Sequence, residues 1–168
     1  MITRLGRLTR VDRVRRNHAL EHATITVITE RHPTKFLSGR SNRRGFYIFG
    51  DIETGELESA IGEALRRLRR GEAELAIHPR CGTNLAVAGI LSGVSAALAA
   101  QLKPRQNRFS YAVLASIGAL MLAPGVGTEV QRHLTTLADT ADLQVKRVSR
   151  RAFPLMRATS HWIETHST

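Results

Sequence analysis

The sequence has a single cysteine, Cys81, and aromatic residues make up only 5% of its 168 residues. One cysteine excludes an intramolecular disulfide framework, a four-cysteine zinc site and a CxxC redox site. The sequence also lacks a Walker A loop, a dinucleotide-binding GxGxxG motif and the GxSxG nucleophile elbow. Acidic residues are few, with 14 Asp and Glu against 25 Lys and Arg, which gives a formal net charge of +11.

Charged residues are absent from two long stretches, residues 82–102 and 109–128. About 20 helical residues cross a bilayer core of roughly 30 Å, and neither stretch has the polar face that a helix of a soluble protein presents to water. The six residues KPRQNR join the two stretches. We therefore predict two transmembrane helices that form an antiparallel hairpin. The alternative is the central helical hairpin of a soluble bundle.

Basic residues near the ends of the two stretches predict their orientation. The short connection carries three, namely Lys103, Arg105 and Arg108. The opposite side carries ten, namely Arg66, Arg67, Arg69, Arg70, Arg80, Arg132, Lys146, Arg147, Arg150 and Arg151. The positive-inside rule then places both termini in the cytoplasm of a bacterial cell. We expect no cleavable signal peptide, because MITRLGRLTRVDRVRR has no apolar segment.

The first 16 residues are interpreted as a basic arm. Arginines recur at every third position, interleaved with Leu and Val, at Arg4, Arg7, Arg10 and Arg13. Such an arm is usually solvated, but its arginines can also contact anionic lipid headgroups. A nucleic-acid partner is not expected, because the positive-inside rule already accounts for the high sequence pI.

Small residues recur four apart in both apolar stretches, as Gly89 and Gly93 in the first, and Ala112 with Ser116 and Ala115 with Ala119 in the second. This spacing lets helices approach closely in lipid. The close approach can pair the two helices of one chain or join two chains in a homo-oligomer, and the sequence leaves both open.

The remaining residues predict a small α/β cap domain over residues 17–83. The expected elements are a helix over 17–30, a loop over 37–45, a strand over 46–52, an amphipathic helix over 57–68 closed by Gly71, and a strand over 74–77. The helical hairpin follows over 84–131, with a helical continuation over 129–137. A C-terminal segment over 132–168 holds a strand at 143–148 and ends in a polar tail, His161–His166, expected to be frayed.

The residues best suited to bind a metal or to catalyse a reaction lie in the sequence NHALEHAT, residues 17–24. On a helix, His22 lies about 40° from His18, and Glu21 about 60° from His18 on the other flank. Two imidazoles one turn apart can ligate one zinc ion, and a neighbouring carboxylate can take a proton from water. A helix whose histidines are satisfied by ordinary hydrogen bonds is the alternative.

The spacing His18-Ala19-Leu20-Glu21-His22 resembles the HxxEH motif of inverzincin metallopeptidases. The resemblance implies that His18 and His22 are metal ligands and that Glu21 is the general base. In that family a glutamate on a later helix supplies the third ligand, and no motif identifies such a glutamate here.

A second cluster, His78-Pro79-Arg80-Cys81-Gly82-Thr83-Asn84, precedes the first apolar stretch. Proline and glycine make a turn, and Thr83 or Asn84 can cap the following helix. We expect the third zinc ligand to be His78, with Cys81, Glu129 and His133 as alternatives. For Glu129, the simpler interpretation is a charged residue at the boundary between membrane and water.

Taken together, NHALEHATI, GFYIFGDI, AIHPRCGTNLAVAGIL and LTTLAD resemble an uncharacterised family of bacterial membrane proteins over residues 15–150. The resemblance implies the two-span architecture and no activity. The residues themselves favour a membrane-anchored, zinc-dependent hydrolase, with a peptidase as one form. The alternatives are a non-catalytic membrane protein whose cap binds a partner, and a module that handles lipid or a macrocyclic cofactor.

Overall fold

The computed structural model describes residues 9–102, 104–152 and 159–167. The chain divides into two compact units. The first consists of Met1–Ile77 together with Leu134–Thr168, and the second of His78–His133. Each unit is described by itself below.

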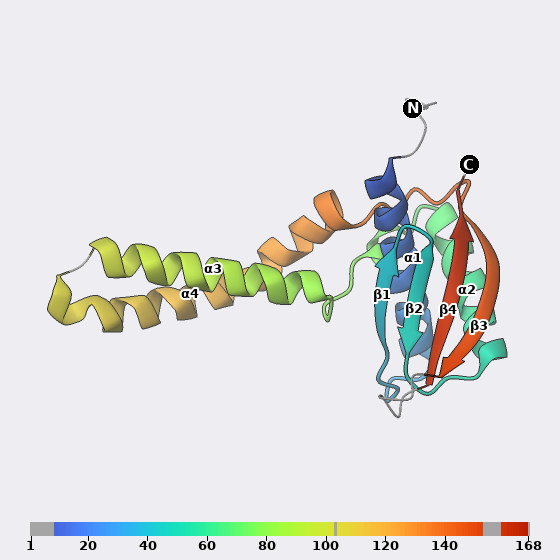
Figure 1. Cartoon of the computed structure of the whole chain (residues 1–168), viewed down its shortest axis with the longest axis horizontal. Helices are drawn as coiled ribbons and strands as arrows, with labels where there is room; N and C mark the ends of the chain where they lie inside the picture. The colour runs from blue at the N-terminus through green and yellow to red at the C-terminus, as the bar shows by residue number, and fades with distance from the viewer. Residues whose placement is uncertain (1–8, 103, 153–158, 168) are drawn as a thin grey trace. The chain divides into compact units, whose positions relative to one another are not determined.

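The first unit is a four-stranded antiparallel sheet with two helices on one face (Figure 1). The strand order is β1-β2-β4-β3, with β1 at Ser38–Asn42, β2 at Gly45–Phe49, β3 at Gln144–Ala152 and β4 at Thr159–His166. The helices are α1, Arg10–Arg31, and α2, Thr54–Arg69. Their apolar faces and the inner face of the sheet enclose one core, which includes the fully buried residues Leu20, Ile28, Phe46, Leu57 and Ile163.

Helix α1 begins seven residues earlier than the helix expected from Asn17. Thr9 and Asp12 form a capping box, in which the Thr9 hydroxyl accepts from the backbone N–H of Asp12 and the Asp12 carboxylate accepts from that of Thr9. This cap satisfies amide groups that a helix start leaves without partners. Residues 10–16 of the expected basic arm therefore form the first turns of a helix.

Helix α2 confirms the amphipathic helix expected over residues 57–68. Its apolar residues are all buried, namely Leu57, Ala60, Ile61, Ala64, Leu65 and Leu68. Gly71 adopts a φ of +94°, the left-handed conformation that ends helices and that glycine adopts without strain.

The segment expected to be a loop over residues 37–45 contains strand β1. Its sequence, SGRSN, has no apolar alternation, and it lies at the edge of the sheet paired only with β2 among the described strands. Arg43 and Arg44 make the turn between the two strands. Gly45 follows with a φ of +150°. Pairing with β2, rather than the side chains of β1, therefore makes this segment a strand.

The expectation of a frayed C-terminal tail is wrong. Residues 159–166 form β4, which pairs with β2 on one side and β3 on the other. Ser160, His161 and Ile163 are buried. The Nε2 atom of His161 lies 3.0 Å from the hydroxyl of Thr54, and burial lowers the pKa of the imidazole below its usual value. A central strand receives hydrogen bonds from both neighbours, which holds these terminal residues in place.

The strand expected over residues 74–77 is also wrong. Residues Ala73–Ala76 form a short 3₁₀-helix, η1. The backbone N–H groups of Leu75 and Ile77 donate to the carbonyls of Glu72 and Glu74. These local hydrogen bonds provide partners for backbone groups of a segment that is not paired in the sheet.

The second unit contains two antiparallel helices, α3 at Gly82–Leu102 and α4 at Arg108–Val130, connected through the 3₁₀-turn η2 at Arg105–Asn107 (Figure 1). A π-helical turn, η3 at Gln131–Thr135, follows α4. Both helices are long and apolar enough to cross a membrane, and their most apolar windows are only 6% and 11% buried. Length and composition alone are weak evidence for a membrane span.

The two helices pack through small residues, of which Ala119 was singled out in the sequence and Ala123 and Gly127 were not. Ala119, Ala123 and Gly127 are the buried residues of α4, and they recur every four positions. A side chain on Gly127 would collide with Asn84 of α3, because its Cβ would lie 2.3 Å from the amide oxygen. A Cβ on Gly89 or Gly93 would meet no described atom within 4 Å. The GxxxG residues therefore do not pair the two helices of this chain.

Candidate metal centre

His18 and His22 lie one turn apart on α1, with ring centroids 4.2 Å apart and ring planes at 61°. The Nδ1 atom of His18 lies 3.0 Å from the carbonyl oxygen of Thr135, and that of His22 lies 2.8 Å from the carbonyl oxygen of Ala76. A carbonyl oxygen only accepts hydrogen bonds, so each Nδ1 atom is the donor. Both rings are therefore oriented by main-chain groups of the same unit.

These two hydrogen bonds set the tautomers of the rings. A neutral imidazole carries one N–H, so protonation at Nδ1 leaves the lone pair on Nε2. Metal-ligating histidines typically donate their other N–H to a carbonyl or carboxylate, which fixes the ring and raises its basicity. His18 and His22 thus have the carbonyl partners and the tautomer that metal ligation through Nε2 requires.

The Glu21 carboxylate is held by strand β1. Ser41 donates its hydroxyl hydrogen to Oε2 of Glu21, and the side chain of Glu21 is only 4% exposed. A Cβ atom on Gly39 would lie 2.4 Å from Oε1 of Glu21, so the carboxylate needs a glycine at that position of the strand. The strand therefore restrains the position of the one carboxylate in the expected motif.

Asn17 and Arg16 anchor α1 at the same level of the helix. The side chain of Asn17 donates to the carbonyl of Asn42 at 2.8 Å and accepts from the hydroxyl of Thr165 at 2.7 Å, which links α1 to β1 and β4. The guanidinium of Arg16 pairs with Asp139 and Asp142. Buried polar groups with satisfied partners make the orientation of a helix specific. These contacts fix the rotation of α1 and, with it, the direction of His18 and His22.

The cluster that contains His78 and Cys81 lies in the second unit, where a network of amide groups stabilises it. Gln131 is fully buried; its Oε1 accepts from the backbone N–H of His78, and its Nε2 donates to Oδ1 of Asn84. Asn84 in turn donates to the carbonyl of Pro79 at 2.8 Å. These bonds fix the turn that leads into α3.

The two expected ligands in this turn differ in their surroundings. The Nδ1 atom of His78 accepts from the backbone N–H of Arg80 at 3.3 Å, which in a neutral ring places the proton on Nε2. Cys81 immediately precedes α3, is 9% exposed, and its sulfur accepts from the backbone N–H of Thr83 at 3.4 Å. Cysteine sulfur is one of the ligands that zinc binds in proteins.

The remaining alternatives, Glu129 and His133, lie on the surface at the end of α4. Their side chains are 57% and 69% exposed, and they pair with each other at 3.2 Å. Arg132 pairs with the same carboxylate. The arrangement is that of charged groups on an exposed helix turn.

Several positions that contribute to the site carried no signal in the sequence. The carbonyls of Thr135 and Ala76 belong to the backbone, so residue types do not report them. Gln131 and Ser41 are single polar residues without a motif. Gly39 is distinctive only once β1 is known to run beside α1.

Comparison with known families covers most of the described chain. Residues 13–148 match the family described as a domain of unknown function, DUF6391. The chain belongs to the DUF6391 family. This confirms the expected resemblance to an uncharacterised family, which extends over both His18 to His22 and His78 to Asn84.

A relative from Picosynechococcus sp., named only as an uncharacterized protein, is 42% identical over 135 residues. The aligned region is 73% of this chain and 65% of the relative. No solved structure matches the chain significantly. The relatives thus supply a family but no activity, and the chemistry must be argued from the residues.

Proposed function

We propose that this DUF6391 chain is a membrane-anchored, zinc-dependent hydrolase whose site is built on α1. The observation that carries the proposal is the pair of Nδ1 donors, from His18 to Thr135 and from His22 to Ala76, at 3.0 and 2.8 Å. Each hydrogen bond orients one ring and leaves its Nε2 atom as the nitrogen with the lone pair. Zinc fits this donor set, because imidazole nitrogen and thiolate sulfur are its preferred ligands.

We propose Cys81 ahead of His78 as the third ligand. The tautomer of His78 places a proton on Nε2, whereas Cys81 offers a sulfur atom, a ligand that zinc prefers.

Glu21 is the proposed general base. It shares a helical turn with His18 and His22, and Ser41 orients its carboxylate. Zinc in such a site lowers the pKa of a bound water. Glu21 would accept a proton from that water and return it to the leaving group, with peptides as one substrate class.

The zinc proposal is tested on the full chain purified in a neutral detergent. Elemental analysis should find about one zinc per chain, and a chelator should remove it. Hydrolysis of a mixture of fluorogenic peptides should stop with the chelator and resume when zinc is restored. Glu21→Gln should keep the zinc and slow hydrolysis by about 100-fold or more.

Two results would contradict this function in different ways. A chain that neither contains zinc nor takes it up would overturn the metal site. A chain that binds zinc with no hydrolysis, or whose hydrolysis is unchanged by Glu21→Gln, would favour the non-catalytic membrane protein.

Membrane insertion by α3 and α4 is a separate part of the proposal. It is supported by the exposure of large apolar side chains along both helices, such as Leu85, Ile90, Phe109, Met121 and Leu122, each at least 65% exposed. Contact of these large apolar side chains with water is unfavourable, whereas contact with lipid acyl chains is favourable. The excess of basic residues outside the short connection supports cytoplasmic termini and a location in the bacterial cell membrane.

Alkaline carbonate washing of bacterial membranes tests the insertion. The full chain should stay in the membrane pellet, because two spanning helices are not released by high pH. A protease added to the cytoplasmic face of inverted vesicles should cut the first unit. Release into the wash would contradict the span, and full protection in inverted vesicles would contradict the orientation.

A further inference from the structure

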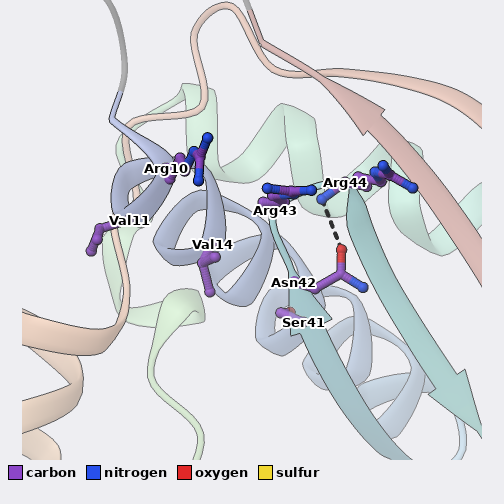
Figure 2. A pocket seen from close by; sticks show the side chains of 7 residues that line it. All are labelled: Arg10, Val11, Val14, Ser41, Asn42, Arg43 and Arg44. Carbon is purple, nitrogen blue, oxygen red and sulfur yellow. Dashed lines mark hydrogen bonds between the residues drawn. The ribbon is translucent and has the colours of Figure 1, made fainter.

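A groove in the first unit brings the start of α1 next to the turn between β1 and β2 (Figure 2). It has a volume of about 760 Å³. Residues from both elements line it, namely Arg10, Val11, Val14, Ser41, Asn42, Arg43 and Arg44. Figure 2 shows Arg10, Val11 and Val14 on the helix, and Ser41 to Arg44 at the end of the β1–β2 hairpin. Residues 33 positions apart in the chain thus share one surface, which is called the arginine groove below.

The charges of the arginine groove all have the same sign. Three of its seven lining residues are arginines and none is acidic. Arg10, Arg43 and Arg44 are exposed. Among the described residues, no ion pair or hydrogen bond involves the guanidinium of any of the three. The nearby carboxylate of Asp12 is occupied by the capping box and by Arg15, and its hydrogen bond with Thr9 lowers its pKa.

The groove also has an apolar side. Val11 is 64% exposed, and Val14 lies one turn further along α1. Guanidinium groups bind phosphate through paired N–H donors, and aliphatic side chains contact the glycerol and acyl region below a lipid phosphate. Valine side chains contribute nothing to the binding of a free polyanion in water. The combination of arginines and exposed valines in one groove therefore favours a lipid over a nucleic acid.

Chain connectivity supplies the second argument for a lipid. Both ends of the second unit continue directly into the first, at Ile77–His78 and at His133–Leu134. If α3 and α4 span the membrane, as proposed above, the first unit is held near the headgroups whatever its orientation. A basic surface in that position experiences a high local concentration of anionic lipid.

We propose that the arginine groove binds the phosphate of an anionic phospholipid headgroup. This inference rests on the proposed membrane location and is independent of the zinc site. It extends the lipid contact expected from the N-terminal arginines by adding Arg43 and Arg44, which the β1–β2 turn brings to α1.

The test uses the full chain in a neutral detergent and a water-soluble, short-chain phosphatidylglycerol, titrated by calorimetry. The double variant Arg43→Gln/Arg44→Gln should bind this lipid about 30-fold more weakly, since each arginine contributes about 1 kcal/mol near a lipid phosphate. The control is Arg66→Gln/Arg70→Gln, which removes the same charge from two exposed arginines, Arg66 in α2 and Arg70 directly after it. It should leave the affinity unchanged.

Further titrations distinguish the lipid from other sources of phosphate. Short-chain phosphatidylcholine should bind much more weakly than phosphatidylglycerol, and inorganic phosphate should not compete at equal concentration. The proposal is overturned if both double variants weaken binding equally, if inorganic phosphate binds as tightly as the lipid, or if a single-stranded oligonucleotide binds through Arg43 and Arg44 while the lipid does not. Because the detergent assay needs no spanning helix, failure of membrane insertion would be seen separately in the carbonate wash.

Discussion

Replacing His22 by alanine is expected to lower the zinc affinity of the chain by at least about 100-fold. Losing a residue that merely orients a ligand costs 10- to 100-fold, and His22 is proposed to be a ligand itself. His22 is 2% exposed and bonded to Ala76, so its ring is already fixed before a metal binds. Competition with a coloured zinc chelator measures the affinity.

A matched set of variants separates ligation from damage to the fold. His18→Ala should weaken zinc binding to a similar degree, and Cys81→Ser should do so if Cys81 is the third ligand. His166→Ala, which removes an exposed histidine at the end of β4, should bind zinc as the unmodified chain does. Equal zinc affinity in His22→Ala, with an unchanged melting temperature, would refute the site on α1.

Gly45→Ala is expected to destabilise the first unit by about 3 kcal/mol or more. A Cβ at this position would lie 1.9 Å from the carbonyl oxygen of Ile163, which belongs to the central strand β4. The φ of +150° adds backbone strain for any residue with a side chain. Strand β2 would have to move away from β4 at its first residue, where the β1–β2 turn ends.

Thermal unfolding of the purified chain, followed by circular dichroism, tests this prediction. A loss of about 3 kcal/mol lowers the melting temperature of a domain of this size by roughly 10 °C or more. Gly62→Ala is the control, because Gly62 lies inside α2 and the nearest atom to an added Cβ would be the end of the Arg66 side chain at 3.6 Å. It should stabilise the helix by about 0.5–1 kcal/mol. A Gly45→Ala variant as stable as this control would show that β2 and β4 are not paired here.

The elements predicted correctly are those whose signal is local. Helix α2 carries six apolar residues at helical spacing and a glycine that ends it, and both features act within one turn of the residues concerned. The two long helices α3 and α4 follow in the same way from uncharged stretches of about 20 residues. Patterns of this kind need no partner elsewhere in the chain to be recognised.

Strands β1 and β4 could not be recognised in this way. The sequence SGRSN of β1 has no strand pattern, and the polar sequence TSHWIETH of β4 is typical of a tail. Both become strands because each pairs with a neighbouring strand, and for β4 one of these neighbours, β2, is distant in the chain. Gly45, for example, faces Glu164 across 119 positions. Cross-strand pairing sets the structure of such segments more strongly than their own side chains do.

The candidate site shows the same division. The sequence alone placed His18, Glu21 and His22 on one turn of a helix, because three- and four-residue spacings determine a helical face. Only the tertiary structure decided which ring nitrogens carry protons, because that depends on carbonyls 54 and 117 positions away, at Ala76 and Thr135. It also decided that Arg43 and Arg44 join Arg10 in one groove, since a hairpin must fold against α1 before the charges meet.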